Sequence, residues 1–237
     1  MQQKIKLLLI LSHSGACSRR RALDLILSGQ VSVNGKIIRE PSAIIDPENS
    51  EVLLDGRPIK ARTHTHVLLN KPAGYVTTLK DPHAEKTVLD LLPQDLKHLR
   101  PAGRLDKDTE GLLIFTNDGE LIYRLTHPKF NIDKTYLVKI DAELTYSQKI
   151  RLEKGIDLDG RSTSAAKISR LCTEKGKSEF RITIHEGRKR QIRRMLEAVG
   201  HKVLALKRIS QASLSLGDLP TGKWRFLSEQ EISFLKK

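Results

Sequence analysis

Three observations in the sequence predict an α+β fold built in two parts. About the first 60 residues combine two helix patterns with short alternating segments that suit a small sheet. The rest of the chain mixes strand-like segments with helical patterns at irregular spacing, which favours an α+β domain over a doubly wound sheet. A polar, unpatterned stretch, KARTHTH from Lys60, separates the two parts. We therefore expect one domain over residues 1–62 and a second over residues 63–237.

The N-terminal part is predicted to begin with two helices. Ile5 and Leu8 belong to an apolar helix face, and Gly15 suits the C-terminal cap of that helix. Ser18 is a favourable N-cap for a second helix that extends to about Gly29.

A small sheet is predicted to follow these helices. VSVNGKII alternates on both sides of Asn34-Gly35, a dipeptide that strongly favours a two-residue hairpin turn. EVLLDGRPI offers a further strand and an Asp-Gly turn.

The larger part contains five strand-like segments, namely HVLLN, GLLIFT, KTYLVKI, EFRITIHEG and KWRFL. Helical patterns lie between them, notably RKRQIRRMLEAVG. The chain closes with LSEQEISFLKK, where Ser228 and Glu231 predict a capping box. Period-two alternation in KTYLVKI puts Tyr136, Val138 and Ile140 on one face, so Tyr136 is expected to point inward.

Composition limits the class of protein. The chain has 237 residues and is 38% hydrophobic, which is enough to build a core and argues against disorder. The formal net charge of +14 predicts a polyanionic partner, because clustered Lys and Arg gain by releasing counterions from phosphates. A charge that serves solubility alone is the alternative.

Cysteines, histidines and hydropathy point to a cytoplasmic protein without a metal. Cys17 and Cys172 are far apart, which disfavours a disulfide framework, and they are assigned to packing. His64 and His66 have no third ligand nearby in sequence and are expected to be solvated. No stretch approaches the roughly 20 apolar residues of a membrane span.

Three arginines follow Ser18 at the start of the second predicted helix. Cations at a helix N-terminus oppose the macrodipole, whereas the free backbone N–H groups there attract an anion. The combination favours a phosphate-binding surface, and a solvated charged turn is the alternative.

GRLDKDTEGLLIFTNDG, residues 103–119, places Asp106 between Arg104 and Lys107, just before an apolar run. The neighbouring cations favour the ionised form of this carboxyl group. An ionised carboxylate can serve as a nucleophile or base. The alternative is a solvated loop charge.

A basic region, residues 188–208, is predicted to include an amphipathic helix. Its apolar stripe consists of Ile192, Met195, Leu196 and Val199, with Gly200 as a cap. Arg190 and Arg194 point away from this stripe and suit phosphates, whereas Arg193 lies at its edge. Arg193 either reaches inward to a buried carboxylate or pairs with Glu197 on the same helix.

About the first 60 residues resemble the S-four-type RNA-binding module, on Ser18-Arg19-Arg20, the helix to Gly29, Asn34-Gly35 and Lys36. The resemblance implies binding of structured RNA. The residues expected to contact RNA in this module are Ser18, Arg19, Arg20, Arg21 and Lys36.

Nearly the whole chain resembles the RsuA/RluB/RluE/RluF family of ribosomal RNA pseudouridine synthases. The resemblance rests on four motifs that follow one another in the order typical of the family: NKPAGYVTT, GRLDKDTEGLLIFTNDG, KTYLVKI and EGRKRQIRRMLEAVGHKVLALKRI. The resemblance implies a catalytic domain with a mostly antiparallel mixed sheet flanked by helices. The final LPTGKWRFLSEQE looks most like the RluB branch, which acts on large-subunit rRNA, and the RsuA branch is the nearer alternative.

The family resemblance also implies roles for individual residues. Asp106 would be the catalytic carboxylate, Tyr136 would stack on the target base and take part in proton transfer at C5, and Arg193 would pair with Asp106. Arg104, with Leu105 beside it, would enter the space left by the flipped uridine or hold its phosphate. Further RNA contacts are expected from Lys71, Arg188, Lys189, Arg190 and Arg194.

The implied reaction needs no redox step, group donor or metal, so no cofactor is expected. The expected partner is a stem-loop of ribosomal RNA, alone or in a pre-ribosomal particle, and the protein is expected to be a monomer. Two alternatives share the basic surface: a non-catalytic ribosome assembly factor, and a nucleic-acid glycosylase that would release free base.

Overall fold

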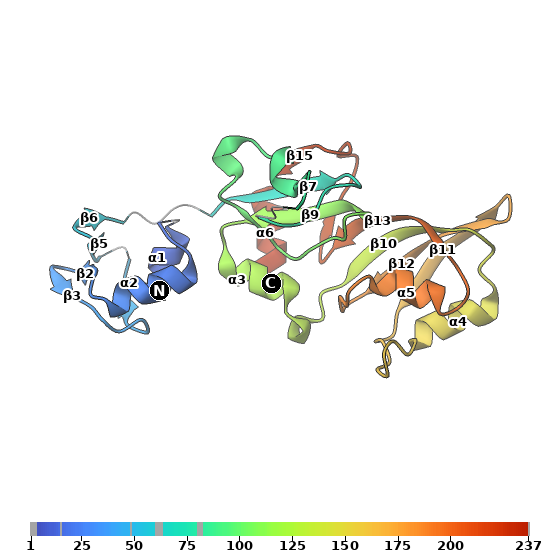
Figure 1. Ribbon diagram of the computed structural model, residues 1–237, viewed down its shortest axis with the longest axis horizontal. Helices are drawn as coiled ribbons and strands as arrows, with labels where there is room; N and C mark the ends of the chain where they lie inside the picture. The colour runs from blue at the N-terminus through green and yellow to red at the C-terminus, as the bar shows by residue number, and fades with distance from the viewer. Residues whose placement is uncertain (1–3, 15, 48, 60–63, 80–82, 237) are drawn as a thin grey trace. The chain divides into compact units, whose positions relative to one another are not determined.

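The computed structural model describes residues 4–14, 16–47, 49–59, 64–79 and 83–236. The chain forms two compact units, residues 1–65 with 117–119 and residues 66–116 with 120–237 (Figure 1). The α+β class is confirmed, since helices accompany a sheet in each unit. The predicted domain boundary, between residues 62 and 63, lies outside the described residues. None of the described helices is long and apolar enough to cross a membrane.

The first unit contains two helices and two small sheets. The bounds are Ile5–Lys6 (β1), Leu7–His13 (α1), Arg19–Leu27 (α2), Val31–Val33 (β2), Lys36–Ile37 (β3), Ile44–Ile45 (β4), Val52–Leu54 (β5) and Arg57–Pro58 (β6). β1 pairs with β4, and the other sheet has the strand order β3-β2-β5-β6. Apolar side chains from α1, α2, β2 and β5 form the core of this unit.

Most local predictions for this unit are confirmed. The Ser18 hydroxyl accepts a hydrogen bond from the backbone N–H of Arg21 at 3.2 Å and so caps α2. Asn34 and Gly35 have φ values of 49° and 77°, which the tight turn between β2 and β3 requires. The prediction for Ile5 is wrong, because this residue lies in β1 and not in α1. The predicted cap at Gly15 lies outside the described residues.

The chain continues with nine strands and seven helices or 3₁₀ turns among the described residues. Their bounds are His66–Lys71 (β7), Val88–Leu91 (η1), Gln94–Leu96 (η2), Arg100–Pro101 (β8), Glu110–Thr116 (β9), Gly119–Thr126 (α3), Pro128–Phe130 (η3), Lys134–Ile140 (β10), Tyr146–Lys154 (α4), Lys167–Glu174 (β11), Lys177–Ile184 (β12), Gln191–Glu197 (α5), Val203–Gln211 (β13), Leu214–Ser215 (β14), Trp224–Phe226 (β15) and Glu229–Lys236 (α6).

The second unit is built on a nine-stranded sheet with the main order β11-β12-β10-β13-β9-β7-β15. Among the described strands only β9 and β13 pair in parallel, which confirms the mostly antiparallel mixed sheet. Gly111 lies at this junction, opposite Arg208, with a φ of 104°. A side chain there would collide with the backbone carbonyl of Arg208, so the close approach of the two strands requires glycine.

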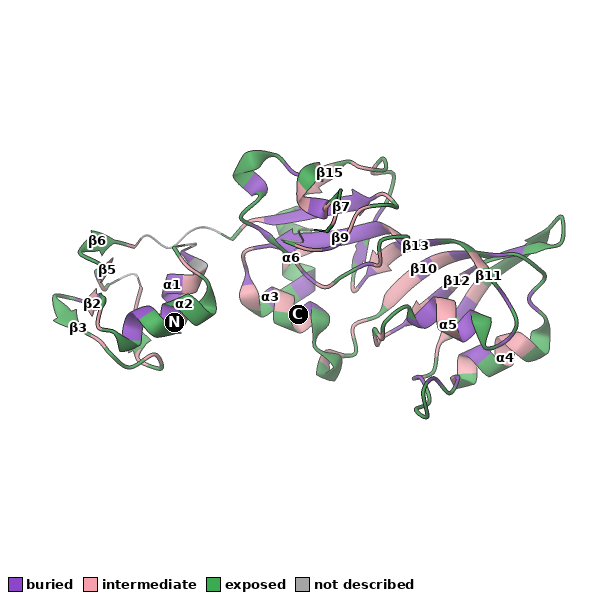
Figure 2. Cartoon of the chain, in the orientation of Figure 1, coloured by how far each residue is buried: buried purple, intermediate pink, exposed green. Residues whose placement is uncertain are grey.

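The two halves of this sheet differ in burial (Figure 2). β7 and β9 are covered on both faces: Leu69 and Leu113 join one core, while Leu68 and Leu112 join a second core with α3 and α6. This is why GLLIFT reads as a continuous apolar run. β10 has one buried face, and the inward position predicted for Tyr136 is confirmed.

Three other predictions for this unit need correction. The helix predicted from residue 188 begins at Gln191, because Arg190 adopts a left-handed conformation with a φ of 51°. His66 is not solvated: it is buried in β7, and its Nδ1 lies 2.8 Å from Thr116 Oγ1. Cys172 is exposed on β11 and does not serve packing.

The predicted capping box at α6 is present and gives a pH-dependent contribution to stability. The backbone N–H of Glu231 donates to Ser228 Oγ at 3.2 Å, and that of Ser228 donates to Glu231 Oε2 at 2.9 Å. Arg225 also donates two hydrogen bonds to the Glu231 carboxylate, at 2.7 and 2.8 Å. These bonds from Arg225 lower the pKa of Glu231 to about 2.

We expect Glu231→Gln to cost about 1 kcal/mol at neutral pH, a value discounted for the partial exposure of both partners. A depressed folded-state pKa gives stability that is complete above the unfolded pKa and is lost as pH falls towards 2. The difference between wild type and variant should therefore shrink below about pH 4.5. Urea unfolding at pH 7 and pH 3 measures it, with Glu229→Gln in the same helical turn as control; a difference independent of pH would contradict this account.

Candidate active site

A cavity of about 550 Å³ opens in the second unit between the segment before β9, strand β10 and the loop before α5. Asp106, Arg104, Leu105 and Tyr136, all singled out in the sequence, line it. The volume falls within the roughly 300–1,000 Å³ of small-molecule sites. One pocket therefore joins an acid, a phenol and a guanidinium that lie up to 32 positions apart in the chain (136 − 104).

The charges around the cavity are unbalanced. Its lining contains five cations and one carboxylate among the described residues, that of Asp106. The cations are Arg104, Lys107, Arg188, Lys189 and Arg190. Such a lining favours a substrate that carries phosphates.

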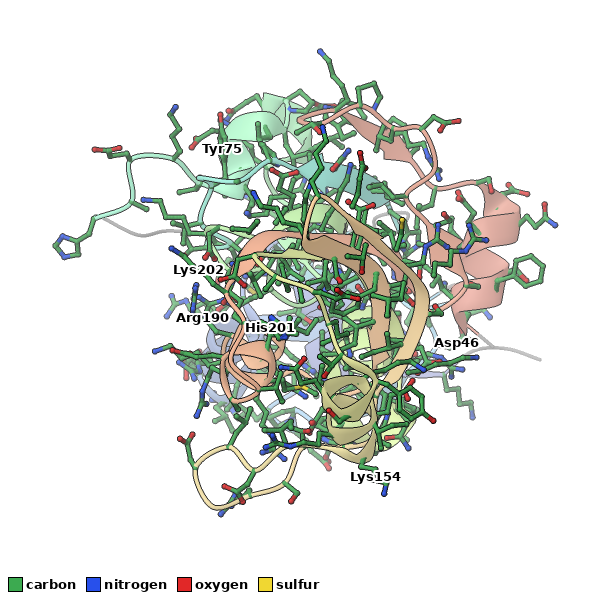
Figure 3. All side chains as sticks on the ribbon, turned by 90° about the vertical axis from the view of Figure 1, so that its right-hand side faces the viewer. Asp46, Tyr75, Lys154, Arg190, His201 and Lys202 are labelled. Atoms are coloured by element: carbon green, nitrogen blue, oxygen red, sulfur yellow. The ribbon has the colours of Figure 1, made fainter. Side chains whose placement is uncertain are left out.

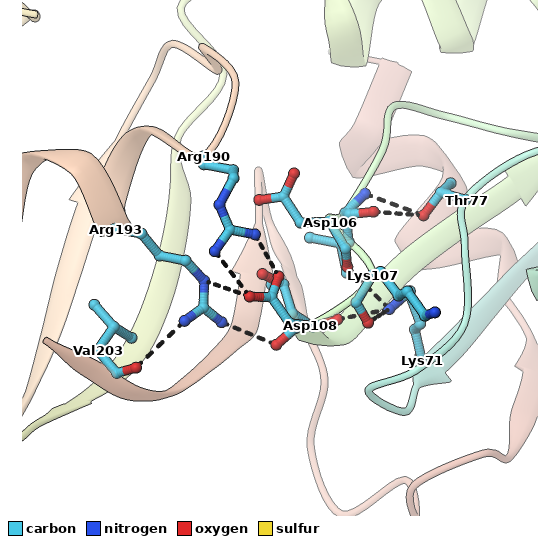
Figure 4. A network of polar contacts seen from close by, with 10 residues as sticks. Lys71, Thr77, Asp106, Lys107, Asp108, Arg190, Arg193 and Val203 are labelled. Carbon is cyan, nitrogen blue, oxygen red and sulfur yellow. Dashed lines mark hydrogen bonds and ion pairs between the residues drawn. The ribbon is translucent and has the colours of Figure 1, made fainter.

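The Asp106 carboxylate is half-buried and makes no hydrogen bond or ion pair with any residue that the structure describes. Figure 4 draws no contact to its oxygens, although it lies close to Arg190 and Asp108. The Tyr136 ring is 8% exposed, and its hydroxyl likewise has no hydrogen-bond partner within the described ranges. Both groups are thus available to a ligand in the cavity.

Thr77 holds the backbone of the loop that carries Asp106. Its buried hydroxyl donates to the carbonyl of Leu105 at 2.8 Å and accepts from the N–H of Leu105 at 3.2 Å (Figure 4). Leu105 is itself 5% exposed and packs in the core, so it anchors the loop from within. Its neighbours Arg104 and Asp106 are therefore held on the cavity wall.

Lys71 secures the same loop and does not contact solvent, which corrects its predicted role in binding RNA. The side chain is 0% exposed. Its ammonium donates to the backbone carbonyls of Thr109 at 2.7 Å, Asp106 at 3.1 Å and Lys107 at 3.3 Å. It also donates to Pro72, at 3.1 Å. Burial lowers the pKa of Lys71 to about 8, against the raising influence of nearby carboxylates.

Arg193 points inward as predicted, but its carboxylate partner is Asp108 and not Asp106. Its Nε lies 3.3 Å from Asp108 Oδ2, and its Nη2 donates to the Asp108 carbonyl at 2.9 Å (Figure 4). The alternative pair with Glu197 is not formed between these described residues.

Arg190 binds the same carboxylate with two hydrogen bonds, at 2.9 and 3.0 Å, from an exposed position at the start of α5 (Figure 3). Burial raises the pKa of Asp108, but the bonds from Arg190 and the charge of Arg193 outweigh it and hold that pKa below its usual range. Asp108 therefore ties the basic segment to the loop that carries Asp106.

Two more arginines expected to bind phosphates are engaged within the protein. Arg188 donates to the carbonyls of Arg161 and Ser162 and pairs with Glu186 at 3.3 Å. Arg194 pairs with Asp159 at 2.6 Å. Lys189 is exposed on the cavity rim without such a pair among the described residues, so it best fits the predicted phosphate contact.

The candidate RNA-binding residues of the first unit are at its surface. Arg19, Arg20 and Arg21 are exposed at the start of α2, and Lys36 is exposed in β3. None of these four forms an ion pair with a described acid. Ser18 has a structural role as the cap of α2.

Sequence reasoning missed Thr77 and Asp108, and it misjudged Lys71. The signals were weak: Thr77 is one of two adjacent threonines, and Asp108 is one of two acids beside the same lysine. Lys71 did carry a signal, because it directly follows the apolar run of HVLLN and precedes Pro72.

Comparison with known proteins supports this picture. A family model described as RNA pseudouridylate synthase matches residues 65–198, and a model of the S4 domain matches residues 5–52. The chain is 41% identical over 229 residues to an uncharacterized RNA pseudouridine synthase of Aquifex aeolicus (strain VF5), which covers 96% of this chain and 92% of that relative. It is 40% identical over 229 residues to ribosomal large subunit pseudouridine synthase B of Bacillus subtilis (strain 168). This match covers 96% of this chain and 93% of that relative.

A solved structure gives the same result. A crystal structure of pseudouridylate synthase superposes with a TM-score of 0.69 at 30% identity and covers 98% of this chain and 99% of that one. The family model spans more than half of the sequence, and the relatives match nearly all of it. The chain therefore belongs to the RNA pseudouridylate synthase family, whose members are isomerases.

Proposed function

We propose that this RNA pseudouridine synthase converts one uridine of large-subunit ribosomal RNA to pseudouridine, with Asp106 as the catalytic carboxylate. The observation that carries this assignment is the cavity in which one carboxylate, a buried tyrosine and five cations meet. The relative from Bacillus subtilis, which is named for the large subunit, supports the choice of ribosomal RNA.

The reaction breaks the N1–C1′ bond of uridine and forms a C5–C1′ bond, while the proton on C5 is lost and N1 gains one. The base has to rotate between these steps, so it has to leave the RNA stack at a cost of a few kcal/mol. A cavity lined by the Tyr136 ring and by cations suits a flipped nucleotide and its phosphates.

In this account Asp106 acts near C1′, either by covalent attack or by taking a proton from the sugar. Both routes need a carboxylate that is not held by a competing partner, and Asp106 has no hydrogen bond or ion pair among the described residues. Tyr136 stacks on the uracil and takes part in proton transfer at C5. Arg104, exposed at the rim, fills the space of the flipped base or holds its phosphate.

The network around Asp108 takes a supporting role. Arg193 does not touch Asp106 but fixes the loop two residues further on, through both the side chain and the carbonyl of Asp108. We infer that Arg193 positions the catalytic loop, whereas the sequence suggested a direct pair. The first unit would dock on structured RNA through Arg19, Arg20 and Lys36.

A non-catalytic assembly factor is the second candidate, because the basic surface alone would serve it. The experiment is incubation of purified protein with both ribosomal RNAs, followed by mapping of carbodiimide adducts that resist alkali. We expect one resistant adduct in large-subunit RNA. An adduct in small-subunit RNA would move the assignment to that subunit, and tight binding without any adduct would favour the assembly factor.

The support of the catalytic loop by Thr77 can be tested with a pair of variants. Thr77→Val keeps the shape but removes both hydrogen bonds to Leu105, so we expect a loss of about 1–3 kcal/mol in stability. Displacement of the loop should lower kcat by about 10- to 100-fold. Thr77→Ser keeps the hydroxyl and should stay close to wild type, and equal kcat values for the two variants would exclude this role for Thr77.

Location in the cytoplasm, the monomeric state and the domain boundary after residue 62 also belong to the proposal. They follow from the sequence, and gel filtration of the purified protein tests the monomeric state.

A further inference from the structure

The segment between β9 and β10 carries a cluster of rings and cations outside the cavity, which we call the cation–aromatic patch. The rings of Tyr123 and Phe130 meet edge to face with centroids 5.6 Å apart, and the ring of His127 lies 4.7 Å from that of Tyr123. The Lys129 ammonium lies 4.9 Å from the Tyr123 centroid and 4.7 Å from the Phe130 centroid. The Arg124 guanidinium lies 5.7 Å from the Phe130 centroid.

This patch is a surface feature and not part of the core. Tyr123 is 46% exposed, and His127 and Lys129 are exposed. The core beneath α3 is formed instead by Leu121 and Leu125. Packing of the unit therefore does not explain why two rings gather here in a chain with only 4% aromatic residues.

The patch is also positively charged. Residues 121–132 contain no acid. Neither Arg124 nor Lys129 forms an ion pair with a described acid. Their cations lie over ring faces. Such a contact contributes about 0.5–1 kcal/mol at an exposed site, so an anion that binds the cation more tightly than the ring does can displace it.

Two observations place the ends of this segment near the cavity. A Cβ placed on Gly103, the residue before Arg104, would lie 3.5 Å from the methyl group of Thr126, which is next to His127. At the other end of the segment, Lys134 donates to the carbonyl of His185 at 3.1 Å, two residues before the lining residue Gly187. The segment 126–134 thus begins beside Gly103, one residue before Arg104, and ends beside the stretch that leads to Gly187.

We propose that the cation–aromatic patch binds an unpaired nucleotide of the RNA substrate next to the flipped uridine. Its base stacks on the exposed Tyr123 ring, with Phe130 holding that ring edge-on. The Lys129 ammonium leaves the ring face and takes the neighbouring phosphate. Aromatic faces bind single-stranded bases of any sequence, and cations beside them bind the backbone. The site rests on the proposed function only in that its ligand is the RNA that enters the cavity.

The test compares Tyr123→Ala with Tyr123→Phe and with Tyr146→Ala as a matched control. Tyr146 is 78% exposed at the start of α4 and belongs to no such cluster among the described residues. Binding is measured in the Asp106→Asn background on the rRNA fragment that this protein binds most tightly, so that affinity is read separately from conversion. Failure of wild type to modify any rRNA would refute the proposed function, whereas the patch is judged on affinity for RNA alone.

Loss of one stacked base should weaken RNA binding by about 5- to 100-fold in Tyr123→Ala, without changing the salt dependence. Lys129→Ala should weaken binding and lower the slope of log Kd against log salt by about one. Tyr123→Phe and Tyr146→Ala should bind like their parent. Affinity of Tyr123→Ala within twofold of the parent, or an equal loss in Tyr146→Ala, would overturn the assignment.

Photocross-linking provides a second readout that needs no variant of Tyr123. RNA with 5-iodouridine at the unpaired positions flanking the target should cross-link to Tyr123 or Phe130 in wild type. Cross-links confined to other residues would overturn the proposal.

Discussion

Asp106→Asn is expected to lower pseudouridine formation by about 10⁴-fold or more, while the protein folds and binds RNA almost as the wild type does. The substitution keeps the shape of the side chain but removes the charge that would act near C1′. Stability should change by no more than about 0.5 kcal/mol, because this carboxylate has no partner in the described part of the protein.

Conversion is measured by nucleoside composition of the treated RNA, and binding by filter retention of the same fragment. Asp95→Asn, an exposed acid of η2, is the matched control and should retain full activity. Near-normal conversion by Asp106→Asn would remove the carboxylate from the mechanism. A joint loss of folding and conversion would make Asp106 a structural residue.

Lys71→Met is expected to cause the largest structural effect in the site. The variant leaves four carbonyl oxygens without their donor, at about 1–3 kcal/mol for each oxygen that finds no water. Relief from burying a cation offsets part of this cost. We expect a net loss of about 2–4 kcal/mol and a fall in kcat of about 10²-fold, because the loop with Asp106 shifts.

The pH dependence of this variant gives a sharper test. The folded-state pKa of Lys71, about 8, lies below the 10.5 of an ordinary lysine. Above pH 8 the unfolded chain holds a proton that the folded protein has released, so this residue adds stability as pH rises towards 10.5. The stability gap between wild type and Lys71→Met should therefore widen over that range in denaturant titrations.

Lys139→Met, on the exposed face of β10, controls for removal of a surface charge and should show a small gap with no such trend. A gap for Lys71→Met that is constant from pH 7.5 to about 10 would show that burial does not shift this amine.

Local signals in the sequence predicted much of the fold. The hairpin turn at Asn34-Gly35, the cap at Ser18 and the capping box at Glu231 depend on neighbouring residues and are all present. Alternation in β10 predicted which face of the strand is buried. What the sequence could not predict is set by distant partners. The basic stretch after α5 becomes β13 because it pairs with β10 on one side and β9 on the other.

The candidate site divides in the same way. Asp106, Tyr136 and Arg104 were found from their motifs, and they do line one cavity. The partner of Arg193 was misjudged because helical spacing gives the direction of a side chain but not the carboxylate that it meets. The loop turns so that Asp108, and not Asp106, meets Arg193 and Arg190. Lys71 holds this turn.

Asp108 also helps to explain how so many cations can lie around the single carboxylate of the cavity lining, that of Asp106. Asp108 binds two arginines, Asp159 binds a third and Glu186 a fourth, so part of the positive charge near the cavity is neutralised within the protein. The cations left for RNA are those at the rim, of which Lys189 and Arg104 are the best placed. This division separates residues that shape the site from residues that attract the substrate.

The most direct test of the central claim is release of tritium from ribosomal RNA that carries uridine labelled at C5. Isomerisation replaces the C5–H bond by a C5–C1′ bond, so each converted uridine should release one tritium to water and no free uracil. We predict such release with wild type and none with Asp106→Asn. Release of uracil, or equal release of tritium by both proteins, would contradict the account of this cavity as a uridine isomerase that works through Asp106.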